Sequence, residues 1–239
     1  MKYNNRSYLT EVGFTLIEVV MAITVSIVVT SVIYTSLSQV MSLKVLLDDE
    51  RELGMVSNSV LDRLTRELQL ITADSGKLLP PKNNLSQTYS DNVDLIGESG
   101  SLPNGESGDS ITFIAKDGGQ YVHDGITHTG AIQITYRVAE DPENSAGKEY
   151  ASYYLIRDET PLTRKYDTAY DKTMTFPVTS RLVSLRFRYF DADEEVWSDK
   201  WDEKKYKLPR LIQFKLKLRA PSGRIKSFAS TIPIGQSSL

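Results

Sequence analysis

The sequence predicts an α+β fold in which one long N-terminal helix packs on an antiparallel β-sheet. Residues 19–43 contain no Asp, Glu, Lys or Arg, and residues 48–71 repeat apolar side chains every three or four positions. From residue 111 onward, apolar and polar side chains alternate. A period near 3.6 is typical of a helix with one buried face, and a period of two is typical of a strand. A helix followed by consecutive strands is an α+β arrangement.

The apolar run predicts that residues 14–43 are the membrane-spanning half of the helix. At about 1.5 Å per residue, the run is long enough to cross a hydrocarbon layer about 30 Å thick. Lipid forces the backbone to satisfy its own hydrogen bonds, so a helix is expected despite many β-branched side chains. Ala22, Ser26 and Thr30 recur every four residues, which predicts a face for close helix packing. Chance in an apolar run containing Ser and Thr is the alternative.

Glu18 is the only charged residue of this segment and the first candidate site residue. An ionisable group inside an apolar span is costly, so a partner for it is expected. Residues 13–18 read Gly-Phe-Thr-Leu-Ile-Glu and resemble the processing signal of type IV pilins and type II secretion pseudopilins. The resemblance implies a pilin-like fold, a leader at residues 1–13, cleavage by a prepilin peptidase between Gly13 and Phe14, and N-methylation of Phe14.

Cleavage would free a positive amine close to Glu18. The amine of a neighbouring subunit could neutralise the carboxylate in low dielectric, where an unpaired charge is least tolerated. This reading makes Glu18 an assembly residue. The alternative is an ordinary signal anchor in which Glu18 merely reaches toward the membrane surface.

Residues 44–71 are predicted as the amphipathic half of the same helix. One apolar stripe contains Leu53, Val56, Val60, Leu64, Leu68 and Ile71. Asp62 with Arg66, and Arg63 with Glu67, have i,i+4 spacing and are expected on the wetter side. Acidic residues 48–52 are expected at the solvated neck where the helix leaves the bilayer.

Residues 72–239 are predicted to form a periplasmic pilin-like β domain. Residues 72–109 are rich in Ser, Asn, Gly and Pro and are expected to be a variable loop, with one short strand near 93–96. Further strands are predicted at 111–114, 132–138, 153–156, 182–190, 211–218 and 225–234.

The C-terminal half carries a second resemblance. Residues 188–191 read Arg-Tyr-Phe-Asp, Trp197 and Trp201 follow, and Leu208-Pro209 opens a strand. This pattern is similar to the J-type minor pseudopilin of type II secretion. It implies a place in the tip complex that initiates pseudopilus assembly and supports secretion across the outer membrane. The implied partners are the I-, K- and H-type minor pseudopilins and the inner-membrane secretion platform.

Trp197 and Trp201 lie four residues apart in a charged loop, where they are expected to fix the loop to the sheet. A surface waiting for a partner subunit is the alternative reading. His123 and His128 flank Asp124, and Asp191 with Asp193 presents alternate acidic oxygens. Each set could bind a metal, but neither has a complete ligand pattern, so no metal and no cofactor are expected.

Composition narrows the function further. The net charge of −3 becomes −4 once the leader, with its two cations and one anion, is removed, which argues against a nucleic-acid partner. There is no cysteine and no phosphate-binding glycine loop, and a non-enzymatic role is expected. Lys2 and Arg6 precede the span, which predicts a single-pass inner-membrane protein whose C-terminal domain is periplasmic. The alternatives are a minor pilin of a type IV pilus and a signal-anchored periplasmic enzyme or binding protein.

Overall fold

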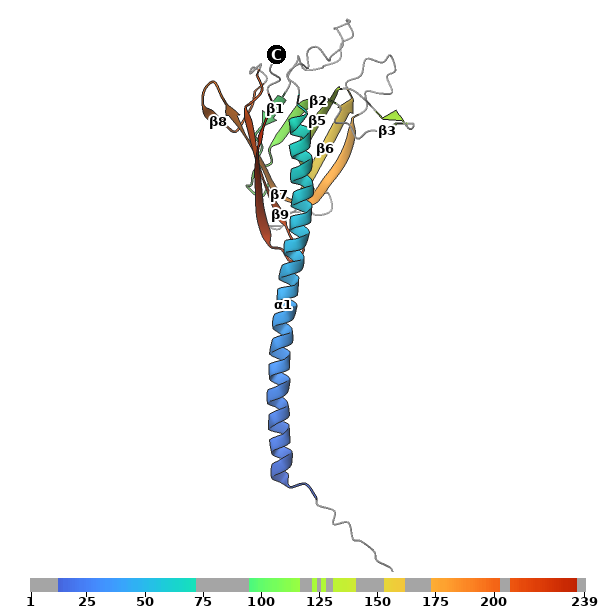
Figure 1. Ribbon diagram of the computed structural model, residues 1–239, viewed down its shortest axis with the longest axis vertical. Coiled ribbons are helices and arrows are strands. Elements are labelled where there is room, and N and C mark those ends of the chain that lie inside the picture. The colour runs from blue at the N-terminus through green and yellow to red at the C-terminus, as the bar shows by residue number, and fades with distance from the viewer. Residues whose placement is uncertain are drawn as a thin grey trace, which may run out of the picture. The chain divides into compact units, whose positions relative to one another are not determined.

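The computed structural model describes residues 13–71, 95–116, 131–140, 153–161, 173–202 and 207–235, together with the backbone of 122–123 and 126–127. These residues form one helix and ten strands (Figure 1). The chain divides into two compact units, Met1–Asp48 and Asp49–Leu239. The predicted leader, except Gly13, and residues 72–94 lie outside the described residues.

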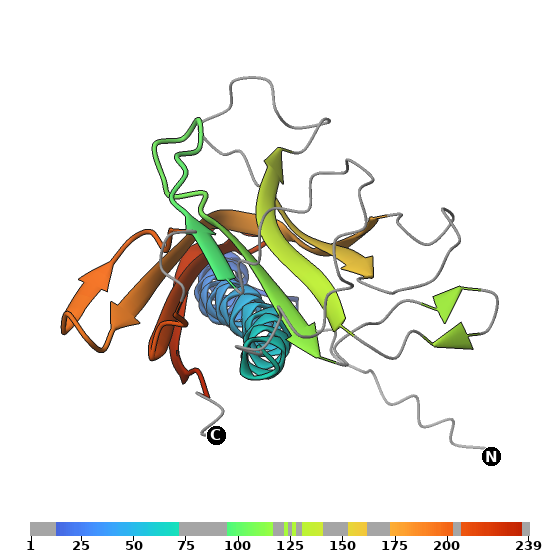
Figure 2. The ribbon, with the colours of Figure 1, turned by 90° about the horizontal axis from the view of Figure 1, so that it is seen from above.

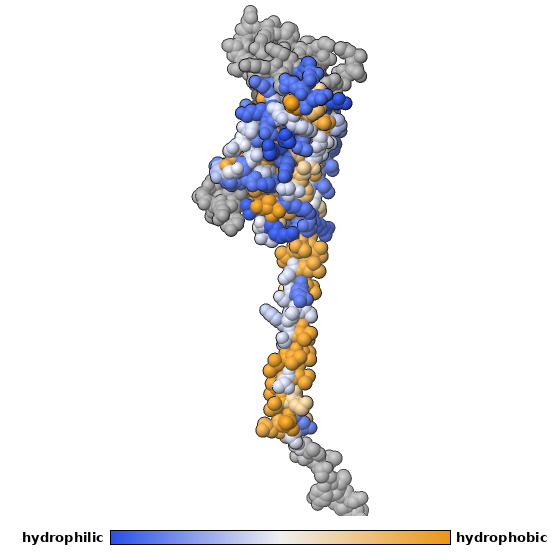
Figure 3. Space-filling view, turned by 90° about the vertical axis from the view of Figure 1, so that its left-hand side faces the viewer, coloured by the Kyte–Doolittle hydropathy of each residue, from blue (hydrophilic) through white to orange (hydrophobic). Residues whose placement is uncertain are grey.

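The helix, α1 (Leu16–Gln69), belongs to both units, and its first part is apolar on all sides. Residues 16–48 are all solvent-exposed. The helix contains a stretch of mean hydropathy 2.5, long and apolar enough to cross a membrane. Figure 3 shows most of this stretch in orange. A helix that is apolar all round needs an apolar environment, such as lipid, on every side.

The second part of α1 packs inside the globular unit. The buried apolar residues of α1 are Leu53, Val60, Leu64 and Leu68, and Val56 packs partly buried beside them. They follow the stripe predicted from the sequence. Beyond the helix, Ile71 makes a bridge to Ala115, and Lys116 donates its backbone N–H to the carbonyl of Leu70. The C-terminal end of α1 is therefore tied to the sheet through the backbone.

The sheet is antiparallel and runs in the order β1-β2-β5-β6-β7-β9-β10, with β8 paired to β7. Its strands are β1 (Leu95–Glu98), β2 (Ser110–Lys116), β5 (Ala131–Glu140), β6 (Tyr153–Pro161), β7 (Met174–Asp191), β8 (Val196–Ser198), β9 (Leu211–Arg219) and β10 (Ile225–Pro233). The short strands β3 (Val122–His123) and β4 (Ile126–Thr127) pair separately. The predicted α+β class is confirmed.

The long strand β7 makes the sheet curl. Its first half pairs with β6 and its second half with β9, and the register shifts between Leu182 and Ser184. Seen from above, the strands curve around α1 (Figure 2). Beyond the end of its pairing with β6, this edge of β7 pairs with a loop. The N–H of Leu185 donates to the carbonyl of Ser107, and the carbonyl of Leu185 accepts a hydrogen bond from the N–H of Asp109.

Asp109 fixes this loop with its side chain. The carboxylate is buried and accepts hydrogen bonds from the backbone N–H groups of Phe187 (2.8 Å) and Gly100 (3.1 Å). Burial raises the pKa of Asp109, and the two N–H donors oppose that rise. Residues 95–109 belong to the segment that the sequence assigns to a variable loop with one short strand. They contain strand β1 and a loop that hydrogen-bonds to β7.

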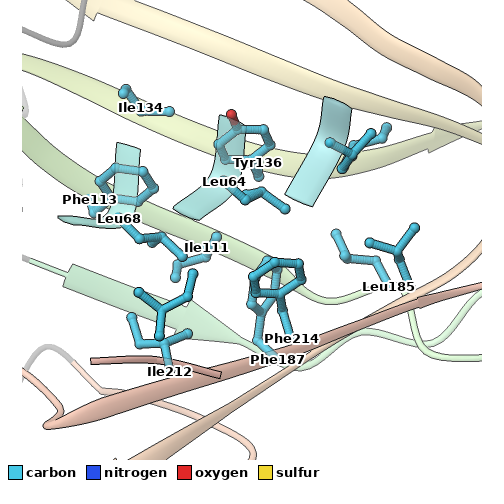
Figure 4. Close-up of a cluster of buried hydrophobic side chains, with 14 of the residues drawn as sticks. Leu64, Leu68, Ile111, Phe113, Ile134, Tyr136, Leu185, Phe187, Ile212 and Phe214 are labelled. Carbon is cyan, nitrogen blue, oxygen red and sulfur yellow. The ribbon is translucent and has the colours of Figure 1, made fainter. Parts of the chain in front are cut away.

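The core fills the space between α1 and the concave face of the sheet (Figure 4). Leu64 and Leu68 of the helix are fully buried. The sheet side chains that bury with them include Ile111, Phe113, Ile134, Tyr136, Leu185, Phe187, Ile212 and Phe214. They come from four strands, β2, β5, β7 and β9, so the helix contacts both halves of the curled sheet.

Four polar side chains are buried beside this core: Glu67 of α1, Tyr136 of β5, and Arg157 and Glu159 of β6. We call them the buried polar cluster. Arg157 Nε donates to both carboxylate oxygens of Glu67, at 3.0 and 3.1 Å, and Arg157 Nη1 donates to Glu159 at 2.5 Å. The Tyr136 hydroxyl donates to Glu67 at 2.6 Å. The cluster therefore links the helix to two strands.

The sequence-based placement of Glu67 is wrong. Local spacing pairs it with Arg63 on the wetter side, and Arg63 Nε does lie 3.4 Å from its carboxylate. However, Glu67 is only 6% exposed and its closest charged contact is Arg157, ninety positions later in the chain. An i,i+4 pattern cannot reveal a partner that the sheet brings in from another strand.

Burial and charge shift the pKa values of two members of the cluster, Tyr136 and Arg157. Burial raises the pKa of Tyr136, and the neighbouring Glu67 carboxylate raises it further, so the phenol remains a donor. Burial alone would lower the pKa of Arg157, but Glu67 and Glu159 outweigh that effect and the pKa rises. The guanidinium is therefore charged at neutral pH.

We predict that Arg157→Leu lowers the free energy of unfolding by about 3–5 kcal/mol, because it removes the buried cation that Glu67 and Glu159 share. Urea titration of the full-length protein in detergent, followed by circular dichroism, measures the loss. Arg137→Leu is the matched control, since the Arg137–Asp158 ion pair is on the exposed side of the neighbouring strand and should contribute about 1 kcal/mol or less. Equal losses for the two variants would contradict a structural role of the cluster.

Candidate assembly site

The N-terminus of α1 is closed by Thr15 and Glu18. Thr15 donates its backbone N–H (2.9 Å) and its hydroxyl (3.0 Å) to the Glu18 carboxylate, and the Glu18 N–H points to the Thr15 hydroxyl at 3.4 Å. Helix starts leave backbone N–H groups without internal partners, and a Thr followed three residues later by Glu satisfies two of them reciprocally. Glu18 is therefore a helix cap in this structure.

The predicted cleavage junction lies just before this cap. Gly13 and Phe14 precede the first helical residue, and both are exposed, Phe14 to 87%. A Cβ placed on Gly13 would meet no atom within 4 Å. Both residues at the predicted junction are therefore solvent-exposed.

Glu18 shares one face of α1 with the predicted packing residues. A shallow strip open to solvent runs along this face. It is lined by Phe14, Glu18, Val19, Ala22, Ile23, Ser26, Ile27 and Thr30. The structure thus places the small side chains at 22, 26 and 30 on the same surface as the carboxylate and the residue that would become the N-terminus. A second helix could approach this surface closely, because the side chains of this surface at positions 22, 26 and 30 are small.

The two tryptophans differ in position. Trp201 is 2% exposed, its backbone exchanges two 2.9 Å hydrogen bonds with Gly97 of β1, and its Nε1 donates to the Lys207 carbonyl at 3.0 Å. A side chain on Gly97 would clash with the Tyr189 ring, which also contacts Trp201. Trp201 therefore anchors its loop in the core and is not part of an exposed partner surface.

Trp197 lies on the outer side of the sheet and is half-buried. Its ring centroid is 5.4 Å from that of Phe190, and the Arg188 guanidinium carbon lies 5.5 Å from it. Trp197 remains a candidate for a partner surface.

The candidate metal ligands fall into two groups. The backbone of His123 is described, but its side chain, Asp124 and His128 lie outside the described residues. Asp191 Oδ1 accepts the backbone N–H of Asp193 at 3.1 Å, in the turn between β7 and β8. Asp193 accepts a hydrogen bond from Lys207. Among the described residues, no three His, Asp or Glu side chains are grouped as a metal would require.

Sequence reasoning missed the cap and the buried polar cluster. The cap could have been recognised, because Thr-x-x-Glu before an apolar run is a known helix-start pattern. The cluster could not, because its members are far apart in the chain, from Glu67 to Glu159.

Searches against protein-family models and curated proteins give no match for this chain. The architecture is nevertheless pilin-like. A long N-terminal helix has an apolar, exposed first part, and its second part packs on an antiparallel sheet.

We predict that Trp201→Ala destabilises the protein by about 3–5 kcal/mol, as expected when a large buried aromatic side chain is removed. Trp197→Ala should cost only about 1 kcal/mol, since it loses one ring pair and one cation–π contact at a partly exposed site. Thermal unfolding of both full-length variants, followed by circular dichroism, compares them. A larger loss for Trp197 than for Trp201 would contradict the assigned positions.

Proposed function

We propose that this protein is a non-enzymatic assembly subunit of a pilin-like filament, anchored in the inner membrane by residues 14–43 with its β domain in the periplasm. The observation that carries the proposal is the first part of α1. It is an exposed apolar helix with a single carboxylate, Glu18, located at its very start and on the same face as its small side chains.

The role of Glu18 follows from electrostatics. The cap supplies hydrogen bonds to the carboxylate, but Thr15 carries no charge that could neutralise it. A carboxylate in low dielectric is strongly stabilised by a nearby cation. The amine freed by cleavage before Phe14 on a neighbouring subunit is such a cation, so helix packing and charge neutralisation would occur together. An inserting subunit would then be held in place by its own buried charge.

The narrower proposal is a J-type minor pseudopilin of type II secretion. It is supported by the Arg-Tyr-Phe-Asp segment at 188–191, the two tryptophans after it and Leu208-Pro209 before β9. In this role the protein would be processed by the prepilin peptidase. It would join the I-, K- and H-type minor pseudopilins at the pseudopilus tip and act with the inner-membrane secretion platform.

A minor pilin of a type IV pilus is the second candidate, because residues 13–18 fit both systems equally. The genes beside this one would distinguish them. Genes for an outer-membrane secretin and a secretion ATPase favour secretion, whereas a retraction ATPase favours the pilus.

We predict that the mature chain in its host begins at Phe14 and that this residue is N-methylated. Intact-mass measurement and N-terminal sequencing of the protein from host membranes test this. Gly13→Leu should leave the full-length precursor, because a bulky residue blocks close approach to the backbone. A mature chain that starts anywhere else would refute the processing step.

We predict that Glu18→Gln is expressed and inserted normally but is not incorporated into the filament. Gln retains the capping pattern with Thr15 and removes only the charge. Thr15→Val is the matched control, since it removes the cap hydroxyl and leaves the charge in place.

Co-purification of each variant with sheared filaments, compared with its amount in membranes, gives the readout. Loss of incorporation by a factor of about ten or more in Glu18→Gln, with a much smaller loss in Thr15→Val, is the expected result for removal of a buried charge pair. Normal incorporation of Glu18→Gln would mean that Glu18 acts as a cap alone. Normal activity of a Glu18→Leu variant would favour the signal-anchored enzyme or binding protein.

A further inference from the structure

The outer face of β7, β9 and β10 is uncovered by any described element. α1 lies on the opposite, concave face of the sheet (Figure 2). On the outer face of β10, the side chains of Ser227, Ala229 and Thr231 are exposed, small and neutral. Figure 3 views the globular unit from the side that carries β8, and this side is predominantly hydrophilic. A partner could therefore approach the backbone of this part of the sheet closely.

The charged side chains that β7 and β9 themselves place on this face have one sign. Every charged side chain in residues 182–190 and 211–219 is Arg or Lys, although the whole chain has a net charge of −3. We call these side chains the basic face: Arg186, Arg188, Lys215, Lys217 and Arg219. Acidic side chains of neighbouring loops compensate part of this charge, since Asp199 contacts Arg186 and Arg188 and Glu106 contacts Lys217.

The cations lie close together. Arg186 is directly opposite Lys215 across the β7–β9 pair, and residues two apart along a strand are spaced by roughly 6.6 Å. Like charges placed directly opposite each other are unfavourable. Lys215, in the middle of the basic face, is exposed and forms no ion pair with a described residue. The arrangement is one that an added anion would stabilise.

The structure shows which anion fits. Asp199 accepts two 3.1 Å hydrogen bonds from Arg186 and lies 3.3 Å from Arg188 Nε. Glu106 binds Lys217 at 2.6 Å. Carboxylates of this chain therefore already bind Arg186, Arg188 and Lys217, and a carboxylate of a partner is the matching group for Lys215.

An aromatic edge adjoins the cations. Trp197 and Phe190 pack together next to Arg188, and Val196 beside them is 47% exposed. Arg and Trp next to an exposed apolar side chain form the combination that dominates protein–protein binding energy. This edge favours a folded protein partner over a purely electrostatic ligand.

We propose that the basic face binds an acidic surface on a different protein, with carboxylates inserting around Lys215 and an apolar side chain meeting Trp197. The inference rests on the charge distribution and does not depend on the filament role.

The test uses the full-length protein in its native membrane. A photoreactive amino acid, p-benzoylphenylalanine, replaces Ala229, whose backbone is paired with Lys215. After irradiation, mass spectrometry should map the adduct to a second protein, at a site surrounded by two or more Asp or Glu residues. Lys215→Glu should lower the adduct yield by roughly fivefold or more, as expected when like charges are brought together at an interface.

Two controls separate binding from folding. Lys116→Glu makes the same charge change at an exposed position on β2 and should leave the yield unchanged. Lys215→Glu preserves the Arg186–Asp199 pair and places opposite charges across the strands, so the thermal unfolding temperature should not fall. Exchanging the mapped acid of the partner for Lys should restore the adduct with Lys215→Glu.

Four results would overturn the proposal. They are an absent adduct, an adduct with phospholipid alone, an adduct with a second copy of this chain alone, and a yield that Lys215→Glu does not change. An adduct with a protein outside any filament would uphold this proposal and count against the proposed function, so the two fail separately.

Discussion

The hydrogen bonds between Glu67 and Arg157 fix how the second part of α1 sits in the sheet. Apolar burial is not directional, so the stripe from Leu53 to Leu68 could by itself tolerate rotation or sliding of the helix. The charged hydrogen bonds of Arg157 Nε to both oxygens of Glu67 are directional and oppose either movement. Because Arg157 also holds Glu159, and Tyr136 holds Glu67, the helix and two strands share one set of directional contacts.

The division of β7 between two neighbours determines which surfaces remain free. Its first half completes the sheet on the β6 side, and its second half carries β9 and then β10. The resulting curl forms a concave surface on which the second part of α1 packs. The basic face lies on the opposite, convex side. The loop at 100–109 closes the curl through Asp109, so a segment that the sequence marks as variable contributes to the shape of the domain.

The sequence predicts the parts of the fold that depend on local period. The helical stripe and the strands at 111–114, 132–138 and 211–218 fall where periodicity predicts them. The first eight residues of β7 were missed, because Pro177 and the polar residues around it mask the strand pattern. The different positions of Trp197 and Trp201 depend on Gly97, a hundred residues earlier, and could not be inferred from their shared loop. At the candidate site, the face that Glu18 shares with the small residues follows from helical spacing. The burial of Glu67 and its contact with Arg157 depend on the tertiary structure.

The burial of the second part of α1 has a mechanical consequence. A force applied along the axis of this part of the helix is carried by its contacts with the sheet. The contacts of Leu53, Val60, Leu64 and Glu67 are spread along that axis, so such a force loads them in shear, all at once. Contacts loaded together resist far larger forces than contacts that separate one after another. The second part of α1 should therefore resist being pulled out of the sheet along its own axis.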